Sequence, residues 1–317
     1  MYEQLFELDP IKINFSNSGN IALNLVLALI MFGVALGIRF DQFNALRKSP
    51  KPIVIGFSLQ FLVLPIITFI LVILLNQFIT PTVAMGMILV AACPGGNISN
   101  FMTSLSKGNV ALSVSLTTIS TIFAIFMTPF NFKLWGSLYV NFINRMAGSM
   151  LKPLEIEYSQ MFETVIIIIG IPVVAGILFA KFFPVIAVKI KKIFQIISII
   201  FFAALVIIMF SSNWELFLSH IKYIFLIVFI HNLCSLLVGY YGAYAFKQPE
   251  RNRRTMTIET GIQNSGLGLV LLLNPAIFPS DMAIGGMMFV TAWWGIWHII
   301  SGLAISFYWA SKPEPAA

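Results

Sequence analysis

The sequence predicts an all-α polytopic membrane protein. Hydrophobic residues make up 59% of the 317-residue chain and charged residues only 10%, and the mean hydropathy is +0.93. Soluble domains, in contrast, carry about 25% charged residues. Apolar runs of about 20 residues, each long enough to cross a bilayer as a helix, recur along the whole chain. Composition therefore excludes a soluble globular protein.

The apolar runs predict nine transmembrane helices. They lie at about 21–38, 53–75, 82–106, 110–130, 162–180, 193–212, 223–246, 255–276 and 282–310. Pro65 and Pro172 are expected to kink their helices. The connection 131–161 is the longest expected loop, and its aromatic residues are compatible with a short helix at the membrane interface.

The basic residues predict the orientation of the chain. With the N-terminus outside, the inner loops hold fourteen Lys and Arg residues and the outer loops five. This bias follows the positive-inside rule. We therefore expect a multi-pass protein of the cell (inner) membrane, with residues 1–20 outside and 311–317 as a cytoplasmic tail. The net charge of +7 thus reports orientation and indicates no nucleic-acid partner.

Two of the predicted helices are interrupted. The third span breaks at residues 93–97 and the eighth at residues 261–268, where Gly, Pro and polar residues replace apolar ones. The two spans cross the membrane in opposite directions. Paired broken helices mark the binding region of inverted-repeat transporters. The first repeat would cover about 21–130 and the second about 162–310, so one helix is missing from the front of the first repeat.

Glu259 is the acidic residue in the interior of a predicted span. A carboxylate at membrane depth costs several kcal/mol unless it is paired, so it marks a candidate functional site. Hydroxyl, amide and glycine residues surround it in the sequence, and their oxygens suit a hard cation at a helix break. The alternative is a structural ion pair with Arg253 or Arg254, which lie close to Glu259 along the same helix.

Further polar residues lie inside apolar spans, and each has a structural alternative. Asn97, Ser99 and Asn100 follow the break in span 3 and could instead stabilise a kink. Ser113 and Thr117 share one face of span 4 and could bond to their own helix. Gln60, in span 2, could join helices to each other.

Two histidines lie inside predicted spans. His298 is a candidate for substrate contact or for simple packing. His231 and Cys234 are three residues apart, but no third ligand stands near them in the sequence, so we expect no transition-metal site. Sodium is the only metal ion expected.

The motifs around the two breaks resemble the bile acid:sodium symporter family. They are Cys93–Asn100, Gly108–Ser113 and Glu259–Gly266, and the first and last lie about 160 residues apart. The span pattern agrees with that family over about 21–310. The resemblance implies a panel domain, a core domain, two crossing unwound helices and alternating access with two sodium ions.

The resemblance also implies the residues of each site. Sodium site 1 would comprise Ser99, Asn100, Ser113, Thr117 and Glu259. Sodium site 2 would comprise Gln60, Glu259, Gln263 and the backbone carbonyls of Thr260 and Ile262. The substrate would contact Asn97, Asn264 and His298.

The sequence departs from the family at three points. The expected first helix is missing, as in nine-helix members of the family. Ile299 stands where bacterial relatives often have Asn, and Asn97 stands where a small hydroxyl residue is common. The changes at Ile299 and Asn97 leave open whether the substrate is a steroid such as a bile acid or a small keto or hydroxy acid.

The sequence therefore favours a sodium-coupled symporter of an organic anion over three alternatives. A proton could replace sodium at Glu259, or the chain could be a sensor that binds its ligand without moving it. An intramembrane hydrolase is disfavoured because no nucleophile–base pair is visible. We expect no enzyme activity and no cofactor; the expected partners are an organic anion, sodium and the lipid bilayer.

Overall fold

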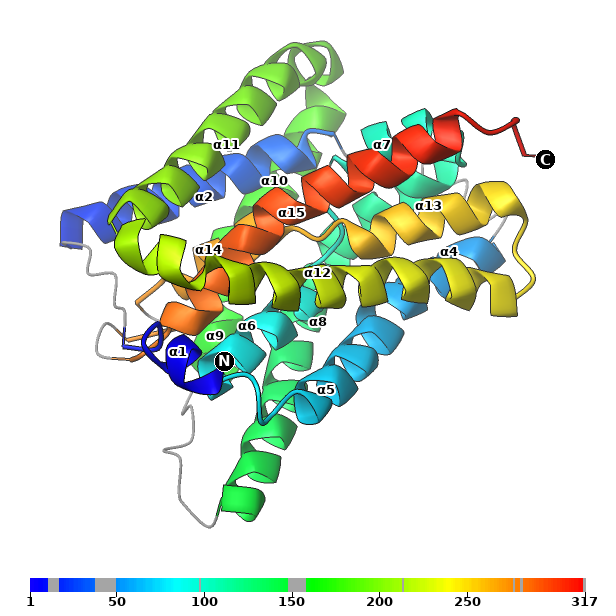
Figure 1. Cartoon of the computed structure of the whole chain (residues 1–317). Coiled ribbons are helices and arrows are strands. Elements are labelled where there is room, and N and C mark those ends of the chain that lie inside the picture. Colours follow the sequence, from blue (N-terminus) through cyan, green and yellow to red (C-terminus); the bar gives the residue numbers. More distant parts are fainter. Residues whose placement is uncertain are drawn as a thin grey trace.

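The chain folds into a bundle of helices (Figure 1). A computed structural model describes residues 1–10, 17–37, 50–96, 98–147, 158–212, 214–275, 277–279 and 282–315. The α-helices are α1 (Tyr2–Phe6), α2 (Asn17–Ala35), α4 (Pro50–Ser58), α5 (Leu64–Leu74), α6 (Pro81–Ala92), α7 (Ser99–Leu105), α8 (Val110–Ala147), α9 (Tyr158–Val165), α10 (Ile171–Phe182), α11 (Pro184–Ser212), α12 (Trp214–Ala245), α13 (Glu250–Gly261), α14 (Ser265–Leu272) and α15 (Gly285–Ala310). Two π-helical segments, η1 (Leu59–Val63) and η2 (Ile166–Gly170), join α4 to α5 and α9 to α10.

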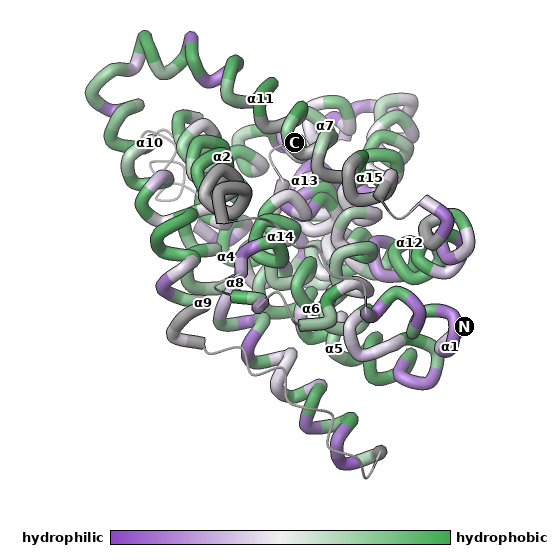
Figure 2. The backbone as a smooth tube through the Cα atoms, turned by 90° about the vertical axis from the view of Figure 1, so that its left-hand side faces the viewer, coloured by the Kyte–Doolittle hydropathy of each residue, from purple (hydrophilic) through white to green (hydrophobic). Residues whose placement is uncertain are grey.

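The all-helical prediction is confirmed for the described residues. Each predicted span overlaps one continuous or interrupted helix, and apolar residues predominate along most of these helices in Figure 2. Five helical stretches are long and apolar enough to cross a membrane, at 50–74, 110–146, 162–182, 218–245 and 285–310. That nine helices cross the membrane stays a prediction.

Both predicted helix breaks are present. The first separates α6, which ends at Ala92, from α7, which begins at Ser99. The second separates α13, which ends at Gly261, from α14, which begins at Ser265.

The two kink-forming prolines each follow a π-helical segment. Pro65 and Pro172 are the second residues of α5 and α10, directly after η1 and η2. Proline lacks an N–H and its ring clashes with the carbonyl four residues earlier, so it cannot continue a regular α-helix. A wider π turn absorbs this clash while the chain stays helical.

The prediction of a loop from residue 131 is wrong, because α8 continues without interruption to Ala147. The reason lies partly in Asn131. Its Nδ2 donates a hydrogen bond to the Phe61 carbonyl at 3.0 Å, and Phe61 lies four residues before Pro65, which has no N–H to donate to this carbonyl. Phe132 and Tyr139 are also buried. Asn131, the first residue of the predicted loop, is thus a buried helix contact.

The helices form two groups that pack through different elements. Helix α2 packs on α10 and α11, whereas α13 packs along α12 and α6 packs on α15. The backbones of α12 and α13 approach each other closely at Gly239, where a Cβ atom would lie 2.5 Å from the Met256 carbonyl oxygen. The second group holds both broken helices.

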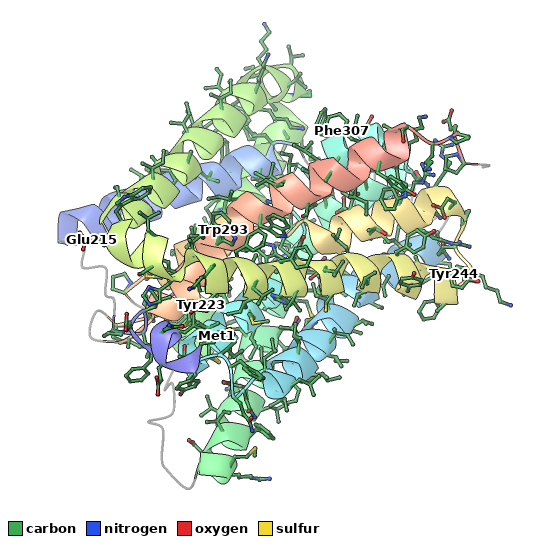
Figure 3. All side chains as sticks on the ribbon, in the orientation of Figure 1. Met1, Glu215, Tyr223, Tyr244, Trp293 and Phe307 are labelled. Atoms are coloured by element: carbon green, nitrogen blue, oxygen red, sulfur yellow. The ribbon has the colours of Figure 1, made fainter. Side chains whose placement is uncertain are left out.

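The N-terminal residues pack on one end of the second group. Leu5 and Leu8 are fully buried, and Figure 3 shows Met1 at the same end of α12 as Tyr223, with Tyr244 toward the other end. Asp9 accepts hydrogen bonds from Thr80 Oγ1 at 2.9 Å and from Thr82 Oγ1. Burial raises the pKa of the Asp9 carboxyl, and these two hydrogen bonds oppose the rise.

We predict that Asn131→Leu lowers the free energy of unfolding by about 1–3 kcal/mol, because it leaves the buried Phe61 carbonyl without a donor. Denaturant unfolding of the purified protein in detergent measures this. Ser137→Ala, an exposed position on the same helix, is the control and should be near neutral. Equal stability of Asn131→Leu and the parent protein would contradict the proposed role.

Candidate functional site

The two broken helices meet at their unwound segments. Gly96 N–H donates to the Ile262 carbonyl at 2.7 Å, and Asn264 N–H donates to the Pro94 carbonyl at 2.8 Å. Gly95 and Gln263 form an isolated antiparallel bridge. Each break therefore supplies hydrogen-bond partners for backbone groups that the other has freed, which a low-dielectric interior requires.

Local sequence explains where the helices stop and restart. Cys93 has extended geometry, with φ of −74° and ψ of 157°, as expected for a residue that precedes a proline. After the second break, the side chain of Asn264 caps α14 by accepting the Leu267 N–H at 3.0 Å.

Glycine residues at the crossing allow the two unwound segments to approach closely. A Cβ atom at Gly95 would lie 3.1 Å from Glu259 Oε2, and one at Gly96 would lie 3.2 Å from the Gln263 carbonyl oxygen. The two glycines thus let the first break lie directly against α13.

The five residues implied for sodium site 1 lie in one hydrogen-bonded cluster. Glu259, which is only 5% exposed, accepts from Ser99 Oγ at 2.6 Å, from Ser113 Oγ, and from Thr117 Oγ1 at 3.0 Å. Asn100 Oδ1 lies 3.0 Å from Ser113 Oγ, within hydrogen-bonding distance. Helices α7, α8 and α13 therefore direct their oxygen atoms to one point.

The structural alternative for Glu259 does not hold. Arg253 and Arg254 contact Glu250 instead, with N–O distances of 3.6 and 3.2 Å. Arg254 also donates to the Ser106 carbonyl at 3.0 Å. Among the described residues, no cationic side chain pairs with Glu259.

Three of the groups implied for sodium site 2 also adjoin one another. Gln60 Nε2 donates to Gln263 Oε1 at 2.8 Å and to the Cys93 carbonyl at 2.9 Å, and Gln263 Nε2 donates to the Thr260 carbonyl at 2.7 Å. The Ile262 carbonyl instead accepts from Gly96. Glu259 Oε2 and the Ile262 carbonyl both adjoin the Cβ position of Gly95, at 3.1 and 3.9 Å.

Of the predicted substrate residues, Asn264 and His298 are described by the structure, and no hydrogen bond joins these two. Asn97 lies outside the described residues. Asn264 caps α14, and His298 is buried on α15 with no hydrogen-bond partner at Nδ1 in the described part of the chain. His231, which is also buried, contacts Thr68 Oγ1 through Nε2 at 2.8 Å.

One residue near the crossing, Asn232, was not predicted from the sequence. Asn232 Nδ2 donates to the Gly261 carbonyl at 2.8 Å. The available signal was an amide in the apolar interior of α12, next to His231. Such an amide must find partners inside the protein.

The donor set at Glu259 suits a hard, monovalent cation. It consists of a carboxylate, three hydroxyls and an amide oxygen, and oxygen ligands are those that hard cations prefer. The hydroxyl groups can donate to the carboxylate and still offer lone pairs to an ion.

Comparison with known proteins identifies the family. Residues 24–220 match the profile of the Sodium Bile acid symporter family. The chain belongs to this family. Because the family contains sodium-dependent transporters and the structure has several long apolar helices, the chain is a multi-pass membrane protein.

Individual relatives extend the match. A Bacillus subtilis protein named "Uncharacterized sodium-dependent transporter YocS" is 32% identical over 290 residues, which cover 92% of this chain and 83% of that protein. A rice protein named "Probable sodium/metabolite cotransporter BASS2, chloroplastic" is 28% identical over 295 residues, 92% of this chain and 64% of that protein. The "Ileal sodium/bile acid cotransporter" of Cricetulus griseus is 29% identical over 248 residues, 77% of this chain and 67% of that protein.

We predict that Gly95→Ala lowers the free energy of unfolding by about 1–3 kcal/mol, because the added methyl group pushes against Glu259 in a packed interior. Gly170→Ala is the matched control, since its Cβ atom would have no neighbour closer than 3.6 Å. Thermal unfolding in detergent should separate the two variants. The same loss in both, or in neither, would refute the close packing inferred at the crossing.

Proposed function

We propose that this protein is a sodium-coupled symporter that carries an organic anion into the cell by alternating access. The observation that carries the proposal is the position of Glu259. Its carboxylate is buried where the two broken helices cross, and hydroxyl groups from two other helices converge on it.

Charge balance supports a bound cation. An ionised carboxylate in a low-dielectric interior requires a compensating positive charge. Arg253 and Arg254, the nearest arginines in the sequence, pair with Glu250 instead. A sodium ion would supply the missing charge. Moving one charge inward down the membrane potential releases about 2.3 kcal/mol per 100 mV, which is available to drive uptake.

We assign the residues as the sequence implies. Sodium site 1 comprises Ser99, Asn100, Ser113, Thr117 and Glu259. Sodium site 2 comprises Gln60, Glu259, Gln263 and the carbonyls of Thr260 and Ile262. Asn97, Asn264 and His298 would face the substrate.

An anionic substrate follows from the same electrostatics. Two sodium ions that share one glutamate leave a net positive charge at the crossing. The N-terminus of α14 begins there, and its helix dipole adds to that charge. Among the relatives, one name refers to a bile acid and another to a metabolite, so both a steroid acid and a small carboxylate remain candidates.

Alternating access would move the two helix groups against each other. Helices α2, α10 and α11 would form the panel domain, and the helices around the two breaks would form the core domain as an inverted repeat. In this arrangement nine spans place the N-terminus outside and the C-terminus inside. Lys107 Nζ donates to the Lys312 carbonyl at 2.7 Å and Arg254 to the Ser106 carbonyl, so these three basic residues gather at one end of the bundle, as an inner face requires.

A proton is the second candidate for the coupling ion. The hydroxyl cluster around Glu259 would accommodate a protonated carboxyl as well as a carboxylate with a bound ion. Uptake measured at fixed pH, with sodium replaced by potassium, distinguishes the two candidates. Uptake that persists in potassium and follows the pH gradient would favour the proton.

We predict that Glu259→Gln abolishes sodium-driven uptake of radiolabelled organic anions in proteoliposomes, because it removes the charge shared by both sodium sites. The variant should still fold, since an amide oxygen can accept the same hydroxyl donors. Glu163→Gln, an exposed position on α9, is the control and should keep normal uptake. Normal sodium dependence in Glu259→Gln would show that the glutamate is structural.

A second prediction separates ion from substrate residues. Ser113→Ala and Thr117→Ala should raise the sodium concentration that gives half-maximal substrate binding, about tenfold, with little change in substrate affinity at saturating sodium. His298→Ala should weaken substrate binding at every sodium concentration. Because binding linkage is reciprocal, each variant shifts the other ligand's apparent affinity when its own ligand is subsaturating.

Titrating substrate at several sodium concentrations tests this division. If Thr117→Ala weakened substrate binding equally at saturating sodium, the proposed division between ion and substrate residues would be wrong.

A further inference from the structure

The last turn before each helix break is held in the same way. Gln60 Nε2 donates to the carbonyl of Cys93, which directly follows α6, at 2.9 Å. Asn232 Nδ2 donates to the carbonyl of Gly261, which ends α13, at 2.8 Å. Each amide is almost fully buried, at 4% and 1% exposure, and each comes from the helix that precedes the broken one. Gln60 belongs to proposed sodium site 2, which raises the question of what Asn232 does.

The Gly261 carbonyl lies between the two carbonyls assigned to sodium site 2. Thr260 precedes it and Ile262 follows it. The final carbonyls of a helix have no partner within the helix, so their directions are set by contacts from outside. The bond from Asn232 fixes the peptide plane between Gly261 and Ile262. It thereby restricts the backbone torsions on either side of this peptide, which set the directions of the Thr260 and Ile262 carbonyls.

A third helix fixes the orientation of Asn232. Ser301 Oγ, on α15, donates to Asn232 Oδ1 at 2.6 Å. The amide oxygen therefore faces α15, and its NH₂ group faces Gly261. The Ser301 hydroxyl also lies 3.2 Å from the His298 carbonyl. The hydroxyl has a single proton to donate, and we assign it to Asn232 Oδ1 because that contact is the shorter of the two.

We propose that Asn232, oriented by Ser301, is a positioning residue for sodium site 2. It holds the unwound end of α13 so that the Thr260 and Ile262 carbonyls can face an ion. This inference rests on the proposed sodium-coupled function. Asn232 itself contacts no ion in this arrangement, because its amide oxygen and NH₂ group are engaged by Ser301 and Gly261.

The test uses sodium alone and the full-length protein in detergent. Intrinsic tryptophan fluorescence and thermal stability are followed as sodium chloride replaces potassium chloride at constant ionic strength. The variants are Asn232→Leu, which removes both hydrogen bonds, and Ser301→Ala, which removes only the orienting bond. Ser235→Ala is the matched control, since Ser235 is buried on the same helix and its hydroxyl donates only to the His231 carbonyl, at 2.9 Å.

We expect Asn232→Leu to raise the half-saturating sodium concentration about tenfold, in line with the loss of groups that orient metal ligands. Ser301→Ala should raise it about threefold, as for one lost hydrogen bond. Ser235→Ala should leave it unchanged. If Asn232→Leu does not fold, the half-saturating sodium concentrations of Ser301→Ala and Ser235→Ala are compared instead. A rise in Ser301→Ala alone supports the inference, and equal values in the two variants overturn it.

A double-mutant cycle distinguishes positioning from general destabilisation. In a Gln263→Leu background, where site 2 is already lost, Asn232→Leu should weaken sodium binding no further. In a Ser113→Ala background, which affects site 1, its full effect should persist. Equal effects in both backgrounds, or an unchanged half-saturating concentration in the single variants, would overturn the inference. A parent protein that gives no sodium response would overturn the proposed function itself, which is a distinct result.

Discussion

Burial of the Glu259 carboxylate is the constraint on which the site depends. In a helical membrane protein an ionised acid is stable only where polar groups and a counter-charge replace water. A continuous helix cannot supply enough of these groups, because its backbone oxygens are already bonded to its own N–H groups. The two breaks solve this problem by bringing Ser99 and Gly95 against α13. The hydroxyls of Ser113 and Thr117 complete the shell from α8.

At three irregularities in the described helices, a buried amide from another helix donates a hydrogen bond to a nearby carbonyl. Asn131 donates to Phe61 ahead of Pro65, Gln60 donates to Cys93, and Asn232 donates to Gly261. An unsatisfied carbonyl in this environment would cost several kcal/mol. The amides therefore have a common physical cause, although one supports a kink and two support the crossing. They also explain why helices distant in sequence are held in register at the site.

Hydropathy and the positions of Gly, Pro and polar residues were sufficient to predict most of the helices, the two helix breaks and the polar surroundings of Glu259, because these features depend on short stretches of sequence. They were not sufficient for Asn131 and Asn232. The stretch after residue 130 is less apolar, which is why a loop was predicted there. The structure shows that Asn131 bonds to the Phe61 carbonyl and that α8 continues to Ala147. The partner of Asn232 is likewise 29 residues away. Periodicity carries no information about such contacts.

Under the proposed function, the two sodium sites differ in how ready they are for an ion. At site 1 the hydroxyls of Ser99 and Ser113 donate to Glu259, which leaves their lone pairs for a cation without any rotation of the carboxylate. At site 2 the Gln263 NH₂ group lies 2.7 Å from the Thr260 carbonyl, where a cation would be repelled. Sodium at site 2 therefore requires the Gln263 amide to turn, and its bond to Gln60 must be remade. Since Gln60 also donates to the Cys93 carbonyl after α6, occupancy of site 2 would also change the contacts at the first break.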